Sequence, residues 1–188
     1  VLAYVSNFSL RATKQNYDSY VLAVQWANGY CKANDCGGRE SVVEENTMTI
    51  HGLWPSLKSG KNLDDCTSGV DVVDTGSALF LKLRKNWPSF AGANTDFWNH
   101  EYNKHGYCYI RRYYLSPYKD YLKYFNKTLA LFNDGFHNLM EDMLPDSLGV
   151  YNISTKKFLQ FMYNSPMRLK SNQIHLMCDK KYHQLGEL

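Results

Sequence analysis

The segment TDFWNHEYNKHGYC, residues 95–108, carries two histidines, a glutamate and a lysine within six positions. These four residues are His100, Glu101, Lys104 and His105. If the segment is a helix, each residue advances about 100° around the axis. Glu101 and His105 then lie four positions apart and within reach of each other, as do His100 and Lys104. The spacing therefore predicts a cluster of ionisable groups on one face of a helix.

Two other interpretations of this helix stay open from the segment alone. A solvated helical face with incidental pairs four positions apart gives the same pattern. A zinc site of the HExxH type is the second, and in such sites the two histidines are four positions apart on one face. In this sequence His100 and His105 are five positions apart, which separates them by about 140° and disfavours zinc.

A second signal lies in TMTIHGLW, residues 47–54, where polar and apolar residues alternate as in a half-buried strand. We expect this strand to end at Pro55 and to place His51 on its polar face. Gly52 would leave space for a ligand, and Trp54 would form an apolar wall. A lone histidine in such a strand more often has a structural role than a catalytic one.

Histidines on two separate elements, together with a lysine and a glutamate, match the requirements of phosphoryl chemistry that uses no metal. One neutral imidazole removes a proton, one imidazolium donates a proton, and cations stabilise the charge on phosphorus. Histidine suits both roles because its unperturbed pKa of about 6.5 allows both forms near neutral pH. The two segments together therefore favour a catalytic site.

The remaining sequence predicts one domain, residues 1–188, in which strands and helices are mixed without a regular βαβ rhythm. That arrangement favours an α+β fold. Residues 27–38 (ANGYCKANDCGG) are expected to form a turn-rich loop. Predicted strands are residues 20–26 and 172–178, and predicted helices are residues 77–86, residues 117–133 and a segment that begins at the N-cap Ser154.

Composition excludes disorder and a membrane-spanning segment. Hydrophobic residues make up 44% and charged residues 21% of the sequence, and no apolar run approaches the roughly 18 residues that span a bilayer. The net charge of +3 permits an anionic partner without requiring one. Five cysteines and the sequons at Asn7, Asn126 and Asn152 favour the secretory pathway. The odd number of cysteines leaves one without an internal partner.

The segments TIHGLWPS (residues 49–56) and FWNHEYNKHGYC (residues 97–108) together resemble the two active-site segments of the ribonuclease T2 family. The resemblance extends upstream to VLAVQWANGYC, residues 21–31, and is looser in the C-terminal third. This family comprises secreted, vacuolar and lysosomal acid endoribonucleases, including the plant self-incompatibility ribonucleases. The resemblance implies an α+β domain with a central, mainly antiparallel sheet flanked by helices, and a secreted, endolysosomal or vacuolar location.

The resemblance also implies roles for individual residues. His105 would be the base toward the ribose 2′-hydroxyl, and His51 would be the acid toward the leaving 5′-oxygen. Glu101 and Lys104 would polarise the phosphate and stabilise the transition state, and Glu101 would also orient His105. Further contacts to the phosphate, the nucleotide and the base 5′ to the cut would come from His100, Trp54, Gln25, Phe97, Trp87 and Ser89.

Two tyrosines depart from the family pattern. Tyr102 stands where tryptophan is usual, and Tyr107 stands where threonine is usual. Because Tyr102 falls off the catalytic face of the predicted helix, we expect it to affect packing rather than activity. For the cysteines, the resemblance pairs Cys31 with Cys36 and Cys66 with Cys108, and it leaves Cys178 without a partner in this sequence.

The expected function is cleavage of single-stranded RNA by transphosphorylation, which leaves 2′,3′-cyclic phosphate ends. The resemblance implies no cofactor, no metal ion and no obligate protein partner. The alternative from another class is a catalytically idle descendant that binds RNA or signals outside the cell. The intact set of residues at positions 51, 101, 104 and 105 argues against that alternative.

Overall fold

The structure is a computed structural model that describes residues 2–4, 17–38, 48–63, 66, 70–113, 117–136, 154–165, 168–178 and 185–187. Its centre is an antiparallel sheet. In the described part, the strands are β1 (Leu2–Tyr4), β2 (Ser19–Trp26), β3 (Met48–Ser56), β4 (Met177–Cys178) and β5 (Leu185–Glu187). β3 pairs along one edge of β2, β1 and β5 pair with the other edge, and β4 pairs with β5.

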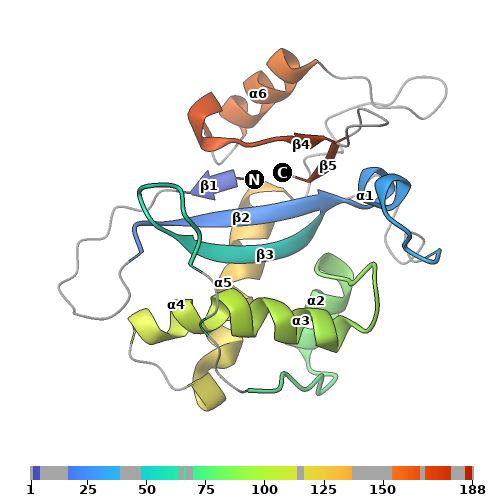
Figure 1. Ribbon diagram of the computed structural model, residues 1–188, viewed down its shortest axis with the longest axis vertical. Coiled ribbons are helices and arrows are strands. Elements are labelled where there is room, and N and C mark those ends of the chain that lie inside the picture. Colours follow the sequence, from blue (N-terminus) through green and yellow to red (C-terminus); the bar gives the residue numbers. More distant parts are fainter. Residues whose placement is uncertain are drawn as a thin grey trace.

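Helices cover the sheet on both sides. In the described part they are α1 (Ala27–Ala33), α2 (Ala78–Asn86), α3 (Asn94–Glu101), the π-helical turn η2 (Tyr102–Gly106), α4 (Tyr107–Arg112), α5 (Pro117–Gly135), α6 (Thr155–Asn164) and the 3-10 turn η3 (Ser171–Gln173). Figure 1 shows α6 on one side of β2 and β3, and α2 to α5 on the other. The expected α+β fold is confirmed. None of the helices in the described ranges is long and apolar enough to cross a membrane.

Strand β2 is apolar enough to be buried on both faces. Its residues 20–25 are all buried, because helices or strands cover them on each side. The strand predicted at residues 20–26 is therefore confirmed. Likewise, the predicted helix at residues 77–86 corresponds to α2, and Ser154 caps α6 by accepting a hydrogen bond from the Lys157 N–H at 3.3 Å.

The sequence suggested that strand β3 ends at Pro55, but in the structure the strand continues past this residue. Pro55 pairs with Tyr20 of β2, and the strand continues to Ser56. The carbonyl of Pro55 points away from β2 and accepts a hydrogen bond from the Leu63 N–H at 2.7 Å. The nitrogen and carbonyl of one strand residue face the same side, so the missing N–H of Pro55 costs no bond between β2 and β3.

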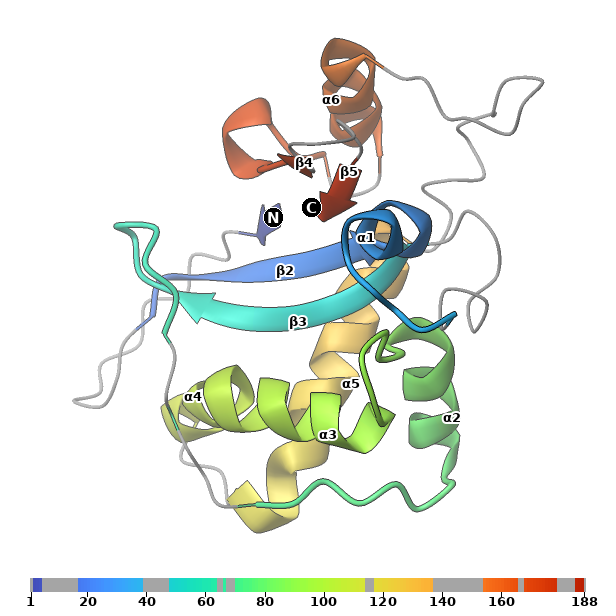
Figure 2. The same ribbon diagram turned by 45° about the vertical axis from the view of Figure 1, so that its right-hand side comes forward.

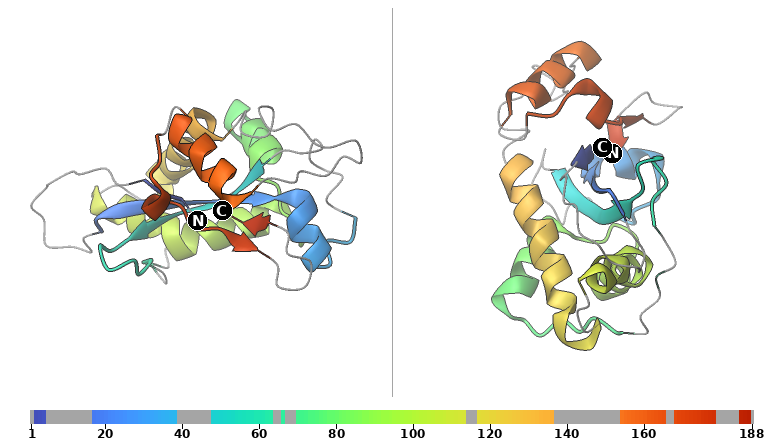
Figure 3. Two further views of the ribbon diagram at one scale, coloured as in Figure 1. Left: turned by 90° about the horizontal axis from the view of Figure 1, so that it is seen from above. Right: turned by 90° about the vertical axis from the view of Figure 1, so that its left-hand side faces the viewer.

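Helix α5 runs obliquely across the face of β3, and α4 and the turn η2 pack against it (Figures 2 and 3). Tyr124 of α5 is fully buried beneath the strand. Its hydroxyl donates to the Leu53 carbonyl at 3.2 Å and accepts from the Leu53 N–H at 3.3 Å. Burial raises the pKa of Tyr124 well above its usual value, so the hydroxyl keeps its proton and the bridge to β3 stays intact.

Other predicted boundaries need correction. The turn-rich loop expected at residues 27–38 begins with a helix, α1, because its first seven residues run straight on from β2 before the turn at Asp35. Of the strand expected at residues 172–178, the first two residues lie in the 3-10 turn η3, and only the last two form a strand, which pairs with β5. Helix α5 extends two residues past the expected end. The sequons at Asn7 and Asn152 lie outside the described residues.

Candidate active site

His51 lies at a β-bulge in β3. The register of β2 and β3 shifts by one residue between Ala23 and Val24, and His51 is the extra residue on β3. A bulge turns a side chain out of the regular alternation and is common beside active sites. The sequence predicted one polar face for Thr49 and His51, but Thr49 is 1% exposed whereas the His51 side chain is 26% exposed. The bulge therefore leaves the His51 side chain partly exposed, although Thr49, two residues earlier in the strand, is buried.

The single helix expected at residues 95–108 is divided in the structure. Helix α3 ends at Glu101, the turn η2 follows, and α4 begins at Tyr107. The Tyr107 N–H donates to the carbonyl of Tyr102, five residues earlier, which widens the turn. The rotation of about 100° per residue of a regular α-helix does not apply within this turn. The angle of about 140° predicted between His100 and His105 is therefore wrong. His105 lies in the wide turn and is 5% exposed.

Gly106 allows α5 to approach this turn closely. A Cβ atom at Gly106 would lie 2.6 Å from the ring of Tyr102 and 2.8 Å from the ring of Tyr124. Tyr124 is also the residue that bridges to β3. Helix α5 therefore holds the strand of His51 and the turn of His105 in a fixed relation.

Glu101 is the buried acid of the cluster, at 1% exposure. Its Oε2 accepts a hydrogen bond from the Trp54 indole N–H at 2.9 Å, and its Oε1 lies 3.5 Å from Nε2 of His51. Burial opposes the charged form, but the bond and charge of His51, the Trp54 N–H and the charge of His105 outweigh it. The pKa of Glu101 is therefore lowered, and the group is a carboxylate near neutral pH.

Gly52 makes room for this carboxylate. A Cβ atom at Gly52 would lie 2.1 Å from Oε2 of Glu101 and 2.5 Å from the indole nitrogen of Trp54. The sequence suggested that this glycine leaves space for a ligand. In the structure, the space is occupied by Glu101.

Trp54 contacts both histidines. Its ring centroid is 5.2 Å from that of His51, with the rings nearly perpendicular, and 5.4 Å from that of His105. Nδ1 of His105 donates to the carbonyl of Leu63 at 2.8 Å, because a carbonyl oxygen only accepts. The neutral imidazole of His105 therefore carries its lone pair on Nε2. The backbone of Leu63 orients this ring, and the orienting role that the resemblance implied for Glu101 stays a prediction.

His100 lies at the rim of the cluster. Its side chain is 61% exposed, and its Nε2 is 4.0 Å from Oε1 of Glu101. Lys104 is half-buried on the turn η2, one residue before His105. The structure thus brings His51, Glu101 and His105 together around Trp54, with His100 at the solvent side.

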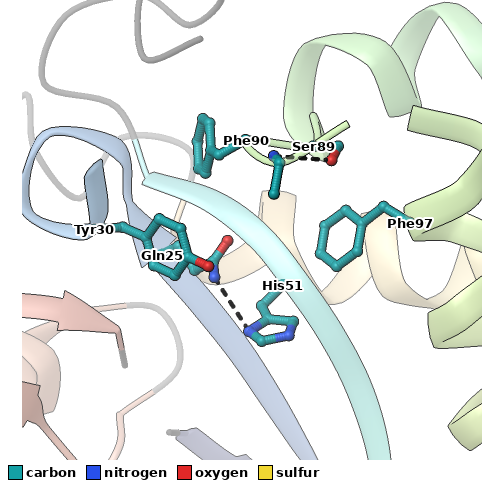
Figure 4. Close-up of a pocket in the computed structure, with 7 residues that line it drawn as sticks. Gln25, Tyr30, His51, Ser89, Phe90 and Phe97 are labelled. Atoms are coloured by element: carbon teal, nitrogen blue, oxygen red, sulfur yellow. Dashed lines mark hydrogen bonds between the residues drawn. The ribbon is translucent and has the colours of Figure 1, made fainter. Parts of the chain in front are cut away.

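A pocket opens on the other side of His51 (Figure 4). Gln25 is 3% exposed, and its side-chain nitrogen lies 3.2 Å from Nδ1 of His51. Phe97 contacts the His51 ring at 5.6 Å between centroids. The pocket is lined by Gln25, Tyr30, His51, Ser89, Phe90, Ala91 and Phe97.

Of the four residues expected around a base, three line this pocket and Trp87 does not. Trp87 is 0% exposed, and its indole N–H donates to the His51 carbonyl at 2.8 Å, so it supports the strand from the core side. The sequence missed Tyr30 and Phe90, whose rings lie 5.8 Å apart in the pocket wall. Tyr30 is next to Cys31, so the small cysteine loop was the available signal for it.

Two disulfides support these segments. Cys31 and Cys36 are linked, and Cys36 packs against Phe90. Cys66 and Cys108 are linked, which joins α4 to the segment after β3. Tyr102 is 0% exposed and contacts the rings of α5, as expected for a residue that affects packing.

Comparison with known proteins gave consistent matches. A family model described as "Ribonuclease T2 family" matches residues 17–185. Ribonuclease DdI of Dictyostelium discoideum is 34% identical over 119 residues, which are 63% of this chain and 50% of that protein. Intracellular ribonuclease LX of Solanum lycopersicum is 36% identical over 105 residues, which are 53% of this chain and 44% of that protein. The matched stretch thus spans about half the length of these curated relatives.

Solved structures share the fold. The self-incompatibility-associated SF11-RNase of Nicotiana alata superimposes with a TM-score of 0.66 at 21% identity, over 92% of this chain and 84% of its own. Ribonuclease MC1 from the seeds of bitter gourd superimposes with a TM-score of 0.64 at 24% identity, over 89% of this chain and 85% of its own.

Proposed function

The chain belongs to the ribonuclease T2 family, and on this premise we propose that it is an endoribonuclease that cleaves single-stranded RNA. In the proposed reaction, the ribose 2′-oxygen attacks the adjacent phosphorus while the bond from phosphorus to the 5′-oxygen breaks. The products are a 2′,3′-cyclic phosphate and a free 5′-hydroxyl. The protein supplies a base for the 2′-hydroxyl and an acid for the leaving oxygen.

The observation that carries this proposal is the pair of imidazoles that both contact Trp54. Each ring lies between 5 and 6 Å from the indole, and the buried carboxylate of Glu101 is held against the same indole. A phosphate placed at the open side of the indole would be within reach of both histidines. Lys104 on the turn η2 and His100 at the rim are the cations that would stabilise its charge.

The surroundings of the two rings differ in a way that favours His105 as the base and His51 as the acid. The Leu63 carbonyl fixes the proton of His105 on Nδ1 and leaves the lone pair on Nε2, as a base requires. His51 faces the Glu101 carboxylate at 3.5 Å, and an adjacent negative charge favours the imidazolium that an acid requires.

This assignment also indicates which base the pocket would hold. His51 lines the pocket, and as the acid it must contact the nucleoside that leaves. We therefore propose that the pocket binds the base 3′ to the cut rather than the base 5′ to it. The rings of Tyr30 and Phe97 offer stacking surfaces for a base. Related solved structures include RNase NT in complex with 5′-AMP, which fits a nucleotide site in this fold.

We further propose that the protein passes through the secretory pathway to the exterior or to an endolysosomal or vacuolar compartment. The two disulfides require oxidising conditions. Asn126 is exposed on α5, with the sequon hydroxyl of Thr128 buried beneath it. Treatment with an N-glycosidase, followed by mass spectrometry of the peptide that contains Asn126, tests this route.

The proposed activity is tested with an RNA oligonucleotide and a copy that carries a single 2′-deoxy sugar, both in the presence of a chelator. The attacking group belongs to the substrate, so cleavage should stop at the deoxy position and continue elsewhere, with cyclic phosphate ends. Cleavage at the deoxy position would contradict the mechanism. A metal-dependent nuclease, which activates water, would stop in chelator.

One relative suggests a second candidate function, a storage or binding role without catalysis. A ribonuclease-like storage protein of Panax ginseng is 34% identical over 91 residues, which are 47% of this chain and 37% of that protein. A storage or binding role for this chain would leave both oligonucleotides intact. The intact set of His51, Glu101, Lys104 and His105 favours the enzyme.

A further inference from the structure

Gln25 contacts two parts of the candidate site at once. Its amide nitrogen lies 3.2 Å from Nδ1 of His51, and its side chain also lines the pocket beside that histidine. At 3% exposure it is nearly enclosed by protein (Figure 4). The amide of Gln25 has an NH2 group at one end and a carbonyl oxygen at the other. When one of these groups faces Nδ1 of His51, the other is left to face the pocket.

The two ends of an amide favour opposite forms of the imidazole. When the NH2 group of Gln25 faces Nδ1, that nitrogen must accept, so His51 is neutral and its proton lies on Nε2. When the carbonyl oxygen faces Nδ1, that nitrogen must donate. With the other ring nitrogen, Nε2, protonated as well, this second form is the imidazolium, which is the form that an acid needs.

We propose that Gln25 couples the identity of the base in the pocket to the protonation of His51. A base that presents a carbonyl oxygen takes the NH2 end of Gln25 and turns the oxygen end toward His51, which stabilises the acid. A base that presents an amino group takes the oxygen end and leaves the NH2 end on His51, which stabilises the neutral form. This inference rests on the proposed function and makes Gln25 a positioning residue.

The coupling predicts a preference in the leaving nucleoside. Uracil and hypoxanthine carry an exocyclic oxygen at the position where cytosine and adenine carry an amino group. The first two should therefore be favoured after the cut. Because both members of each pair have the same shape and stack alike on Tyr30 and Phe97, stacking does not produce this preference.

The other groups around His51 do not sense the base in this way. From α3, Glu101 faces Nε2 at 3.5 Å and stays a carboxylate near neutral pH. His105, from η2, contacts the Trp54 ring. His100, from α3, faces Glu101. In the pocket, Tyr30 is the further ionisable neighbour, and its ring lies in the wall beside Phe90.

The test uses four dinucleotides that have adenosine before the cut and uridine, cytidine, inosine or adenosine after it. For the unmodified protein on the alkaline limb of its pH profile, kcat should be about tenfold higher for uridine than for cytidine and for inosine than for adenosine, the factor of one net hydrogen bond. The alkaline limb of the pH profile should lie at higher pH for the uridine and inosine substrates, because they keep His51 protonated longer.

Variants of Gln25 should change the ratios. Gln25→Leu should bring both ratios near one, since it bonds neither neighbour. Gln25→Glu offers acceptors only, so it should reverse the preference toward cytidine and adenosine and move the alkaline limb to higher pH for all substrates. Phe97→Leu is the matched control: it alters the same pocket without a polar group, so it should lower all four rates while the ratios persist.

A spectroscopic measurement on the unmodified protein tests the coupling without turnover. The ¹⁵N shifts of His51 should indicate more imidazolium with 5′-UMP bound than with 5′-CMP bound at the same pH. Equal shifts, or wild-type ratios that persist in Gln25→Leu, would overturn the coupling while RNA cleavage still stands. If no RNA is cleaved at all, the proposed function fails, and unequal ¹⁵N shifts would still support the coupling.

Discussion

At the scale of single residues, the two histidines and Glu101 should differ in what their removal costs. His51→Phe or His105→Phe removes a proton-transfer group, and each step of general acid–base catalysis contributes roughly 10²–10⁴-fold. Glu101→Gln keeps the shape and the acceptor for Trp54 but loses the charge that faces His51. We expect it to lower kcat less than either histidine variant. Steady-state kinetics on one RNA substrate measures all three, and near-normal turnover by His105→Phe would contradict the assigned base.

The charge of Glu101 also makes stability depend on pH. Its pKa in the folded protein is lower than its usual value, so the carboxylate contributes stability above the unfolded pKa of roughly 4.3. That contribution is lost as the pH falls through the folded pKa. Denaturant unfolding at pH 7 and at pH 3 should therefore show a smaller loss of stability on acidification for Glu101→Gln than for the unmodified protein. The pKa of Asp74 is also lowered, but Asp74 is present in both proteins, so its contribution to the loss of stability cancels in the comparison.

Gly52 is the residue whose replacement should act through Glu101. A Cβ atom would lie 2.1 Å from the carboxylate, so Gly52→Ala must displace the Glu101 side chain or the strand. We expect a large loss of activity and a destabilisation of about 1–3 kcal/mol, typical of overpacking. In a Glu101→Ala background the same change should cost less, since the clash with the carboxylate is gone and only the contact at 2.5 Å with the indole nitrogen of Trp54 remains. Equal costs in both backgrounds, measured by denaturant unfolding, would show that the clash with Trp54 dominates.

At the scale of elements, the wide turn η2 is what sets the position of His105. Deletion of Asn103 removes one residue from the five of the turn, which would let α3 continue into α4 as a regular helix and rotate His105 away from Trp54. We expect helix content by circular dichroism to persist and RNA cleavage to disappear. Asn103→Ala is the control, because it loses the side-chain bonds to Val70 and Asn99 but keeps the turn. Equal activity of the two variants would show that the turn is not needed.

The elements that local patterns specify were predictable, and those that depend on packing between elements were not. Strand β2 and helices α2 and α6 follow from apolar periodicity and an N-cap. The turn η2 was missed because a period of 3.6 residues carries no sign of a wider turn, which here accommodates the close packing of Gly106 on α5. The bulge at His51 was missed because register belongs to two strands together.

The candidate site was likewise predictable only in part. Its histidines and its carboxylate could be identified from residue types and spacing, but the contacts between them could not. Leu63 orients His105 through a backbone carbonyl, which no residue type reveals. Trp87 was assigned to the base through the family resemblance, yet it is fully buried and does not line the pocket. Phe90 lines the pocket through the packing of the cysteine loop.

At the scale of the whole molecule, the disulfide between Cys66 and Cys108 connects both ends of the contact between Leu63 and His105. Cys66 lies three residues after Leu63, whose carbonyl accepts from His105, and Cys108 lies three residues after His105. The bond therefore ties the carbonyl to the imidazole that it orients. The disulfide between Cys31 and Cys36 closes a short loop at the pocket wall instead.

Removal of the two disulfides should therefore have different consequences. In the loop-entropy model, the Cys66–Cys108 bond closes a longer loop and contributes about 4 kcal/mol, against about 2 kcal/mol for the Cys31–Cys36 bond. We expect paired Cys→Ala changes at 66 and 108 to lower stability more and to reduce kcat while the protein is still folded. Paired changes at 31 and 36 should mainly raise KM, because they loosen the wall that holds Tyr30. Denaturant unfolding combined with kinetics at a temperature where both variants are folded measures the difference. A kcat that is unchanged by loss of the Cys66–Cys108 bond would mean that the contact between Leu63 and His105 is held by the packing of α5 alone.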